Sequence, residues 1–109
     1  MNESHFKTLR ELSSNGNLTQ RELSEKLGLS LGSVNFVIQA LVGKGYIKAK
    51  RFKNSRNKAG YMYILTPKGV KEKIIQTEQF IQRKMAEYEQ IRRELELLKN
   101  ENTHKDNEP

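Results

Sequence analysis

Two side-chain amides and one aromatic ring lie close together near the middle of the sequence. Asn35 and Gln39 are four residues apart, about one turn of an α-helix, and Phe36 directly follows Asn35. A side-chain amide can donate and accept hydrogen bonds at the same time, which suits the edge of an adenine base. An aromatic ring can pack on the methyl group of thymine. These residue types on one helix face predict contact with base pairs in the major groove of DNA.

The helix that would carry these side chains runs from Ser30, its predicted N-cap, to Val42. Its apolar residues recur at the spacing of one buried stripe: Val34, Val37, Ile38, Leu41 and Val42. The opposite side carries the predicted base-reading residues: Ser30, Gly32, Ser33, Asn35, Phe36 and Gln39. The helix has no Arg or Lys, the side chains that most often contact guanine, so we expect an A/T-rich binding site.

Another short helix is predicted directly before this one in the sequence. Thr19 and Glu22 have the spacing of a capping box at its start, and Gly28 stands where a left-handed residue would end it. Two short helices joined by a tight turn containing glycine are typical of a helix-turn-helix motif. In such a motif the second helix enters the major groove.

Positive charge is concentrated just after this motif. Residues 1–43 are neutral overall and residues 74–109 carry a net charge of −2. Residues 44–73 have ten basic side chains and one acidic side chain, a net charge of +9. Basic side chains beside a recognition helix suit the phosphates of the DNA backbone. The predicted phosphate contacts are Thr19, Lys44, Lys48, Lys50, Arg51, Lys53 and Lys58.

The residue pattern of this basic segment also predicts a β-hairpin. Residues 46–52 and 61–65 favour two strands, and residues 53–60 form a polar, turn-rich loop without an acidic residue. Together with a first helix over residues 1–13, capped at Ser4, this order predicts a winged helix-turn-helix. We expect Arg56, accompanied by Asn57, to enter a narrow minor groove from the tip of the wing. Strand alternation places Lys48 and Lys50 on one face and Arg51 on the other, so not all of them can contact DNA.

A long helix is expected from Thr66 and Pro67 to about Asn100. Alternating spacings of three and four select a coiled-coil seam, interrupted at Lys84, which predicts a homodimer. The seam residues are Val70, Ile74, Thr77, Ile81, Tyr88, Ile91, Leu95 and Leu98. The fold class is thus mainly α with a small β-hairpin (α+β). It comprises a DNA-binding domain over residues 1–66, a dimerisation helix over 67–100 and a disordered tail over 101–109.

Composition excludes several other classes of protein. The 109 residues include no cysteine, which rules out disulfides and cysteine-ligated metal sites. His5 and His104 lie near opposite ends of the sequence without ligands at suitable spacing, so we expect no metal site, cofactor or enzymatic activity. No apolar run is long enough to span a membrane, and no signal-peptide segment is visible. We expect a cytoplasmic, nucleoid-associated protein.

The segment LTQRELSEKLGLSLGSVNFVIQALVGKGYIKAKRF resembles the winged-helix core of the MarR family, bacterial DNA-binding repressors and activators. The wing KNSRNKAGY and the helix start ILTPKG are closer to a small subgroup associated with extracellular polysaccharide (EPS) gene clusters. The resemblance implies a homodimeric transcriptional regulator that binds double-stranded DNA at a pseudo-palindromic operator and controls polysaccharide-related genes. Typical members have a helix before the first helix of this chain and two C-terminal helices. Because the sequence departs from both features, we expect no small-molecule effector pocket of the family kind.

Two other functions are compatible with the same residues. A winged helix can serve as a protein–protein adaptor with only non-specific nucleic-acid binding, in which case Phe36 would contact a protein partner. The other alternative function is RNA binding through the aromatic side chains of the predicted strands. A two-stranded wing, however, is a poor stacking sheet for RNA bases.

Overall fold

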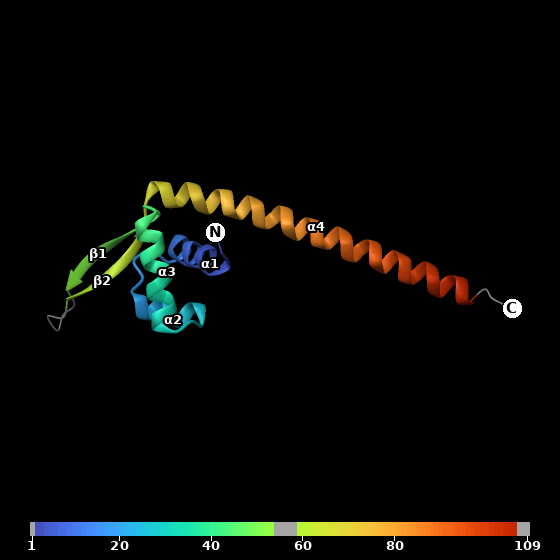
Figure 1. Cartoon of the computed structure of the whole chain (residues 1–109), viewed down its shortest axis with the longest axis horizontal. Coiled ribbons are helices and arrows are strands. Elements are labelled where there is room, and N and C mark those ends of the chain that lie inside the picture. The colour runs from blue at the N-terminus through green and yellow to red at the C-terminus, as the bar shows by residue number, and fades with distance from the viewer. Residues whose placement is uncertain (1, 54–58, 107–109) are drawn as a thin grey trace. The chain divides into compact units, whose positions relative to one another are not determined.

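The computed structural model describes residues 2–53 and 59–106. These form two compact units, Met1–Gln76 and Thr77–Pro109. The elements in chain order are α1 (Glu3–Ser14), α2 (Gln20–Leu27), α3 (Leu31–Gly43), β1 (Ile47–Lys53), β2 (Ala59–Leu65) and α4 (Pro67–Asp106). Within the first unit, α1, α2 and α3 cluster together, and the two strands form a hairpin beside α3 (Figure 1). This is the predicted winged helix-turn-helix in a mainly helical chain.

The core of the first unit forms where the apolar stripes of the three helices meet the hairpin. Leu9 of α1, Leu23 of α2, Ile38 and Leu41 of α3 and Ile47 of β1 are all buried. Val42, which the sequence pattern assigned to the buried stripe of α3, is exposed instead. It lies at the edge of the stripe, because Val34, Val37, Ile38 and Leu41 already fill the side that faces the core.

Side-chain caps fix the starts of the first three helices. The N-cap of α1 is Asn2, whose side chain accepts a hydrogen bond from the backbone N–H of His5 at 2.9 Å. The expected cap, Ser4, lies inside the helix, where its carbonyl accepts a hydrogen bond from the hydroxyl of Thr8. Asn2 is the N-cap because it directly precedes the first residue of α1 and has the extended backbone angles that an N-cap requires.

The hairpin pairs β1 with β2 in antiparallel register, from Ile47 opposite Leu65 to Lys53 opposite Ala59. Leu18 adds an isolated bridge to β2, since the N–H of Tyr63 donates to the Leu18 carbonyl at 2.8 Å. The sequence pattern anticipated a short extended segment at Leu18. Buried Leu18, Ile47 and Tyr63 anchor this sheet to the helical core.

Helix α4 begins as predicted, with Thr66 as its cap and Pro67 as its first residue. The hydroxyl of Thr66 accepts a hydrogen bond from the N–H of Gly69 at 3.0 Å. It also donates to the carbonyl of Gly45, and the backbone N–H of Thr66 donates to the carbonyl of Tyr46. These bonds join the start of α4 to the turn between α3 and β1, so the compact unit includes the first turns of α4, to Gln76.

The second unit is a single stretch of α4. The helix continues to Asp106, beyond the predicted end at Asn100, and every residue from 81 to 103 is exposed. Within the described ranges no single helix is both long and apolar enough to cross a membrane. Helices α2 and α3 reach the length and apolar content of a membrane span only when they are counted together. They are bent by 113° relative to each other, and their apolar side chains line the core.

Candidate nucleic-acid interface

Helix α3 presents the predicted base-reading side chains on its solvent side. Gly32, Asn35, Phe36 and Gln39 are all exposed, while Val34, Val37, Ile38 and Leu41 hold the opposite side in the core. Phe36 is 73% exposed, which is unusual for a phenylalanine on a well-packed helix. The side chains that were predicted to act together therefore do share one accessible face.

The two glycines at the ends of α3 are not required by the fold itself. A Cβ atom built at Gly32 or at Gly43 would meet nothing within 4 Å, and neither residue has a positive φ angle. Glycine nevertheless costs helix stability relative to alanine. An exposed glycine on this face leaves room for the close approach of another molecule to the backbone.

Hydroxyl groups shape the start of α3. The Ser30 side chain accepts a hydrogen bond from the backbone N–H of Ser33 at 3.1 Å and donates to the Ser33 hydroxyl at 2.9 Å. The Ser30 hydroxyl is thus committed to the cap. Ser33 keeps its own hydroxyl hydrogen, so of the two predicted serines it is the better placed to donate to a base.

The turn between α2 and α3 is locked by two hydrogen bonds across it. The amide of Gln20 donates to the carbonyl of Leu31 at 2.9 Å, and the hydroxyl of Ser24 donates to the carbonyl of Leu29. Gly28 adopts the left-handed conformation predicted for it, with φ +66°. These contacts fix the angle at which α3 leaves α2, and so they position the exposed face of α3.

The start of α2 faces a shallow hollow beside the hairpin. Its capping box is formed as predicted, with Glu22 N–H to Thr19 Oγ1 at 3.1 Å and Thr19 N–H to Glu22 Oε1 at 3.2 Å. The hollow has a volume of about 250 Å³ and is lined by Thr19, Gln20, Arg21, Phe52, Gly60, Tyr61 and Tyr63. Arg21, which was not predicted from the sequence, is exposed here beside Thr19. Its place in the first turn of α2 was the available signal, because helix N-termini favour phosphate groups.

The register of the hairpin separates its basic side chains onto two faces. Lys48 pairs with Ile64 and Lys50 with Met62, whereas Arg51 pairs with Tyr61 and Lys53 with Ala59. Successive residues of a strand point to opposite faces, so Lys48 and Lys50 share one face and Arg51 and Lys53 the other. All four side chains are exposed. The predicted tip residues Arg56, Asn57 and Lys58 lie outside the described residues.

The aromatic ring of Phe52 covers Gly60 across the hairpin. A Cβ atom at Gly60 would lie 2.9 Å from Cε1 and 3.0 Å from Cζ of that ring. The ring therefore occupies the space that any larger side chain at position 60 would need. This cross-strand contact supports the last described pairs before the wing tip.

Helix α3 ends in a Schellman motif. The N–H of Tyr46 donates to the Leu41 carbonyl at 3.0 Å and the N–H of Gly45 to the Val42 carbonyl at 2.9 Å, with Gly45 left-handed at φ +77°. Lys44, a predicted phosphate contact, is the exposed C-cap residue of the helix. The motif explains how the chain reverses from α3 directly into β1 of the hairpin.

His5 is a buried titratable group of the first unit. It is 9% exposed, and neither ring nitrogen has a hydrogen-bond partner. Burial lowers the pKa of the His5 imidazole below its ordinary value of 6.5, and the positive charge of Lys44 lowers the pKa further. The neutral form is therefore favoured in the folded chain. Among the described residues, no group of three or more His, Asp or Glu side chains could hold a metal ion.

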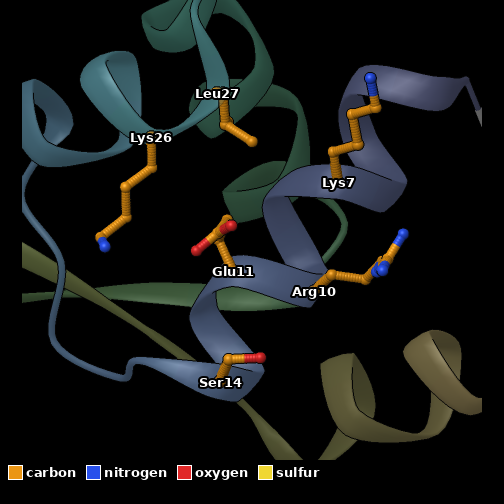
Figure 2. A pocket seen from close by; sticks show the side chains of 6 residues that line it. All are labelled: Lys7, Arg10, Glu11, Ser14, Lys26 and Leu27. Atoms are coloured by element: carbon orange, nitrogen blue, oxygen red, sulfur yellow. The ribbon is translucent and has the colours of Figure 1, made fainter.

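A second hollow lies between α1 and α2 (Figure 2). Its volume is about 320 Å³, and it is lined by Lys7, Arg10, Glu11, Ser14, Lys26 and Leu27. Lys7 already pairs with Glu3 at 3.2 Å, and the Glu11 carboxylate accepts from the Asn15 amide at 3.3 Å. None of the residues predicted to contact DNA lines this hollow, so it does not extend the candidate interface.

Comparison with known proteins shows that this chain is similar to winged helix-turn-helix domains and to MarR from E. coli. A family model described as winged helix-turn-helix DNA-binding matches residues 1–48. The reduced form of MarR from E. coli is 28% identical over 74% of this chain and 57% of its own chain, with a TM-score of 0.62. A MarR variant from E. coli in complex with operator DNA is 27% identical over 67% of this chain and 51% of its own, with a TM-score of 0.57. A variant of MepR from S. aureus, 21% identical, covers 95% of this chain and 75% of its own, with a TM-score of 0.69. No curated protein matches by sequence.

The fold is that of a winged helix-turn-helix, and the family model that matches residues 1–48 describes DNA-binding domains of this kind. In sequence and fold the chain is similar to MarR from E. coli, in agreement with the family resemblance seen in the sequence. The chain spans a little over half the length of the E. coli MarR chain. The resemblance to the EPS-associated subgroup stays a prediction.

Proposed function

We propose that this chain is a sequence-specific DNA-binding transcriptional regulator that inserts α3 into the major groove. The observation that carries the proposal is the exposed face of α3, where two amides and an unburied phenylalanine stand beside a glycine that the fold does not need. Ser33 would donate to a base from the same face. The complex of a similar MarR protein with operator DNA supports this use of the fold.

The operator is expected to be A/T-rich. Asn35 and Gln39 suit adenine, Phe36 suits the thymine methyl group, and α3 has no Arg or Lys for guanine. Arg56 and Asn57 of the wing tip would read a narrow adjacent minor groove, which A/T-rich DNA provides.

Phosphate contacts would hold the domain in register on the duplex. Thr19 and Arg21 at the start of α2 can bind one strand, because both lie at the positive end of a helix. Lys44 and one basic face of the hairpin would bind the phosphates beside α3. These contacts add affinity and salt dependence without adding sequence preference.

The regulator is expected to act as a homodimer through α4. The predicted seam residues Val70, Ile74, Ile81, Tyr88, Ile91, Leu95 and Leu98 are exposed along the helix, and covering them needs a partner. Two copies of α3 about one DNA turn apart, roughly 34 Å, would read a pseudo-palindrome. The protein would work on the nucleoid in the cytoplasm. Polysaccharide-related target genes follow from the EPS-subgroup resemblance alone.

Selection of bound duplexes from a random DNA pool at near-physiological salt tests the proposal. The expected result is an A/T-rich inverted repeat with half-sites about one turn apart. Selection with Phe36→Ala should lose the preference for thymine at one position of each half-site, while the variant stays folded because the ring is exposed. Binding at low salt without any enriched sequence would contradict the proposal.

A protein–protein adaptor is the second candidate, and the exposure of Phe36 is the observation that favours it. In that case DNA binding would be weak and indifferent to sequence. Phe36→Ala would then leave DNA affinity unchanged. The same selection therefore separates the two functions.

A further inference from the structure

The second unit carries an apolar stripe at the spacing of a two-stranded coiled coil. In heptad notation Ile81, Tyr88 and Leu95 take position a, and Ile91 and Leu98 take position d. All five side chains are 49–65% exposed. A hollow of about 400 Å³ beside the stripe is lined mostly by apolar atoms of Phe80, Ile81, Lys84, Met85, Tyr88 and Glu89. Side chains of this kind normally pack against a second helix.

Charged side chains flank this stripe in a pattern that depends on the direction of the partner. Position g, on one side, carries Glu87 and Glu94, and position e, on the other, carries Arg92 and Lys99. In a parallel coiled coil a g residue of one helix meets the e residue five positions later on the other helix. Parallel pairing therefore brings Glu87 to Arg92 and Glu94 to Lys99 of the second copy. The g residue Phe80 likewise meets the e residue Met85, an apolar contact.

Antiparallel pairing would not form these contacts. It brings g residues against g residues and e residues against e residues. Within residues 80–99, position g offers only Phe80, Glu87 and Glu94, so every g contact would be between two acids, between an acid and a ring or between two rings. No attractive charge pair can form at position g in that arrangement.

We propose that residues 77–99 of two copies of this chain pair as a parallel, in-register coiled coil. The proposal rests on the homodimer of the proposed function and adds its orientation and register. Charge complementarity selects a second copy as the partner, because each acidic g residue finds a basic e residue in the same sequence. Chain connectivity then attaches both winged-helix units to the same end of the coiled coil, where they can serve two adjacent half-sites.

Arg92 and Glu94 make only weak contacts within their own helix, so they can pair with side chains of a second copy. Arg92 lies 3.8 Å from Glu89 and 3.7 Å from Glu96 within its own helix, and the side chains of both pairs are more than half exposed. Exposed pairs of this length contribute little to stability, so exchanging them costs little. Glu94 accepts a hydrogen bond from Gln90 at 3.4 Å, which is similarly weak.

Lys84 is the charged residue at a d position, and Thr77 is the other d residue that is not apolar. Its ammonium group pairs with Glu87 at 3.2 Å and lies 5.5 Å from the centre of the Phe80 ring. The lysine can therefore keep its charge at the edge of the seam while its aliphatic stem packs inside. A polar residue in a seam lowers stability but specifies register, because a pairing shifted by one heptad would place one copy of Lys84 against Ile91.

Cysteine crosslinking of the full chain tests the orientation directly, because the natural sequence has no cysteine. In a parallel dimer the two copies of Leu98→Cys face each other across the seam and should form a disulfide-linked dimer on mild oxidation. Asn100→Cys, two residues later on the outer side of the helix, is the matched control and should stay monomeric on a denaturing gel. Light scattering of the unmodified chain supplies the oligomeric state.

The outcomes separate this inference from the proposed function. A monomer by light scattering would show that the proposed homodimer itself is wrong. A dimer in which Leu98→Cys does not crosslink, or crosslinks no better than Asn100→Cys, would reject the parallel arrangement and leave the DNA-binding proposal intact.

A charge exchange provides an independent test. Glu94→Lys and Lys99→Glu should each weaken the homodimer, raising its dissociation constant about tenfold at low salt. A mixture of the two variants should form a heterodimer as tight as the natural homodimer. In the heterodimer each g–e contact again joins an acidic and a basic side chain, whereas each variant paired with itself brings like charges together. Residues 94 and 99 are five positions apart and do not face each other on one helix. A mixture that dimerises no better than either variant alone would therefore contradict parallel pairing.

Discussion

A Cβ atom at Gly69 would lie 1.9 Å from the carbonyl oxygen of Tyr46. This close approach presses the first turn of α4 against the turn that ends α3 and starts β1. The Tyr46 carbonyl is held there because it accepts the backbone N–H of Thr66 at 3.0 Å. The start of the predicted dimerisation helix is thus packed directly against the turn that follows the predicted recognition helix.

Gly69→Ala is expected to lower the free energy of unfolding by about 2 kcal/mol, because backbone atoms on both sides must move to admit the methyl group. Chemical denaturation followed by circular dichroism measures the change. Gly43→Ala is the matched control, since a Cβ at Gly43 meets nothing within 4 Å. Equal stability of the two variants would show that the contact at Gly69 is not tight in solution.

Gly32→Ala should have opposite effects on folding and on DNA binding. The fold has open space at this position, so the higher helix propensity of alanine should raise the free energy of unfolding by up to about 0.5 kcal/mol. DNA affinity should fall about tenfold if the helix backbone approaches the duplex closely at Gly32. Fluorescence anisotropy with the selected operator measures the affinity. A variant that is more stable and binds equally well would place the DNA elsewhere on α3.

The two faces of the hairpin should contribute unequally to DNA binding. The double variant Lys48→Ala/Lys50→Ala removes two charges from one face, and Arg51→Ala/Lys53→Ala removes two from the other. Removing one basic side chain that binds a phosphate should reduce the slope of log affinity against log salt by about one. Only one of the double variants is expected to change the slope. Equal reductions by both would contradict the separation of the faces.

Local sequence signals predicted most of the fold because each acts over a few residues. The capping box of Thr19 and Glu22, the left-handed Gly28 and the start of α4 at Thr66 all depend on near neighbours, and all three are confirmed. The N-cap of α1 was assigned wrongly, because both Asn2 and Ser4 can cap a helix. Only the backbone angles decide between them.

Contacts between distant segments could not be predicted in the same way. The fit of Gly69 against Tyr46 and of Gly60 under Phe52 depends on how the hairpin and α4 return to the core. The exposed face of α3 was predictable, because helical periodicity alone separates Phe36 from the buried stripe. Arg21 has a local signal in its place in the first turn of α2, but the hollow that it lines is completed by Phe52 and Tyr61 of the hairpin, which the local pattern does not show.

The stability of the first unit should fall as the solution becomes acidic, through His5. Burial and Lys44 hold the pKa of His5 below 6.5 in the folded chain, so the unfolded chain binds the proton more readily. Stability should therefore be complete above about pH 6.5, decline as the pH falls below 6.5 and level off once the pH is below the lowered pKa. His5→Leu removes this titration and leaves His104 in place. The difference in denaturation midpoint between the natural chain and this variant, measured from about pH 7.5 to about pH 5, should change with pH in that sense. A constant difference would show that His5 is solvated in the folded chain.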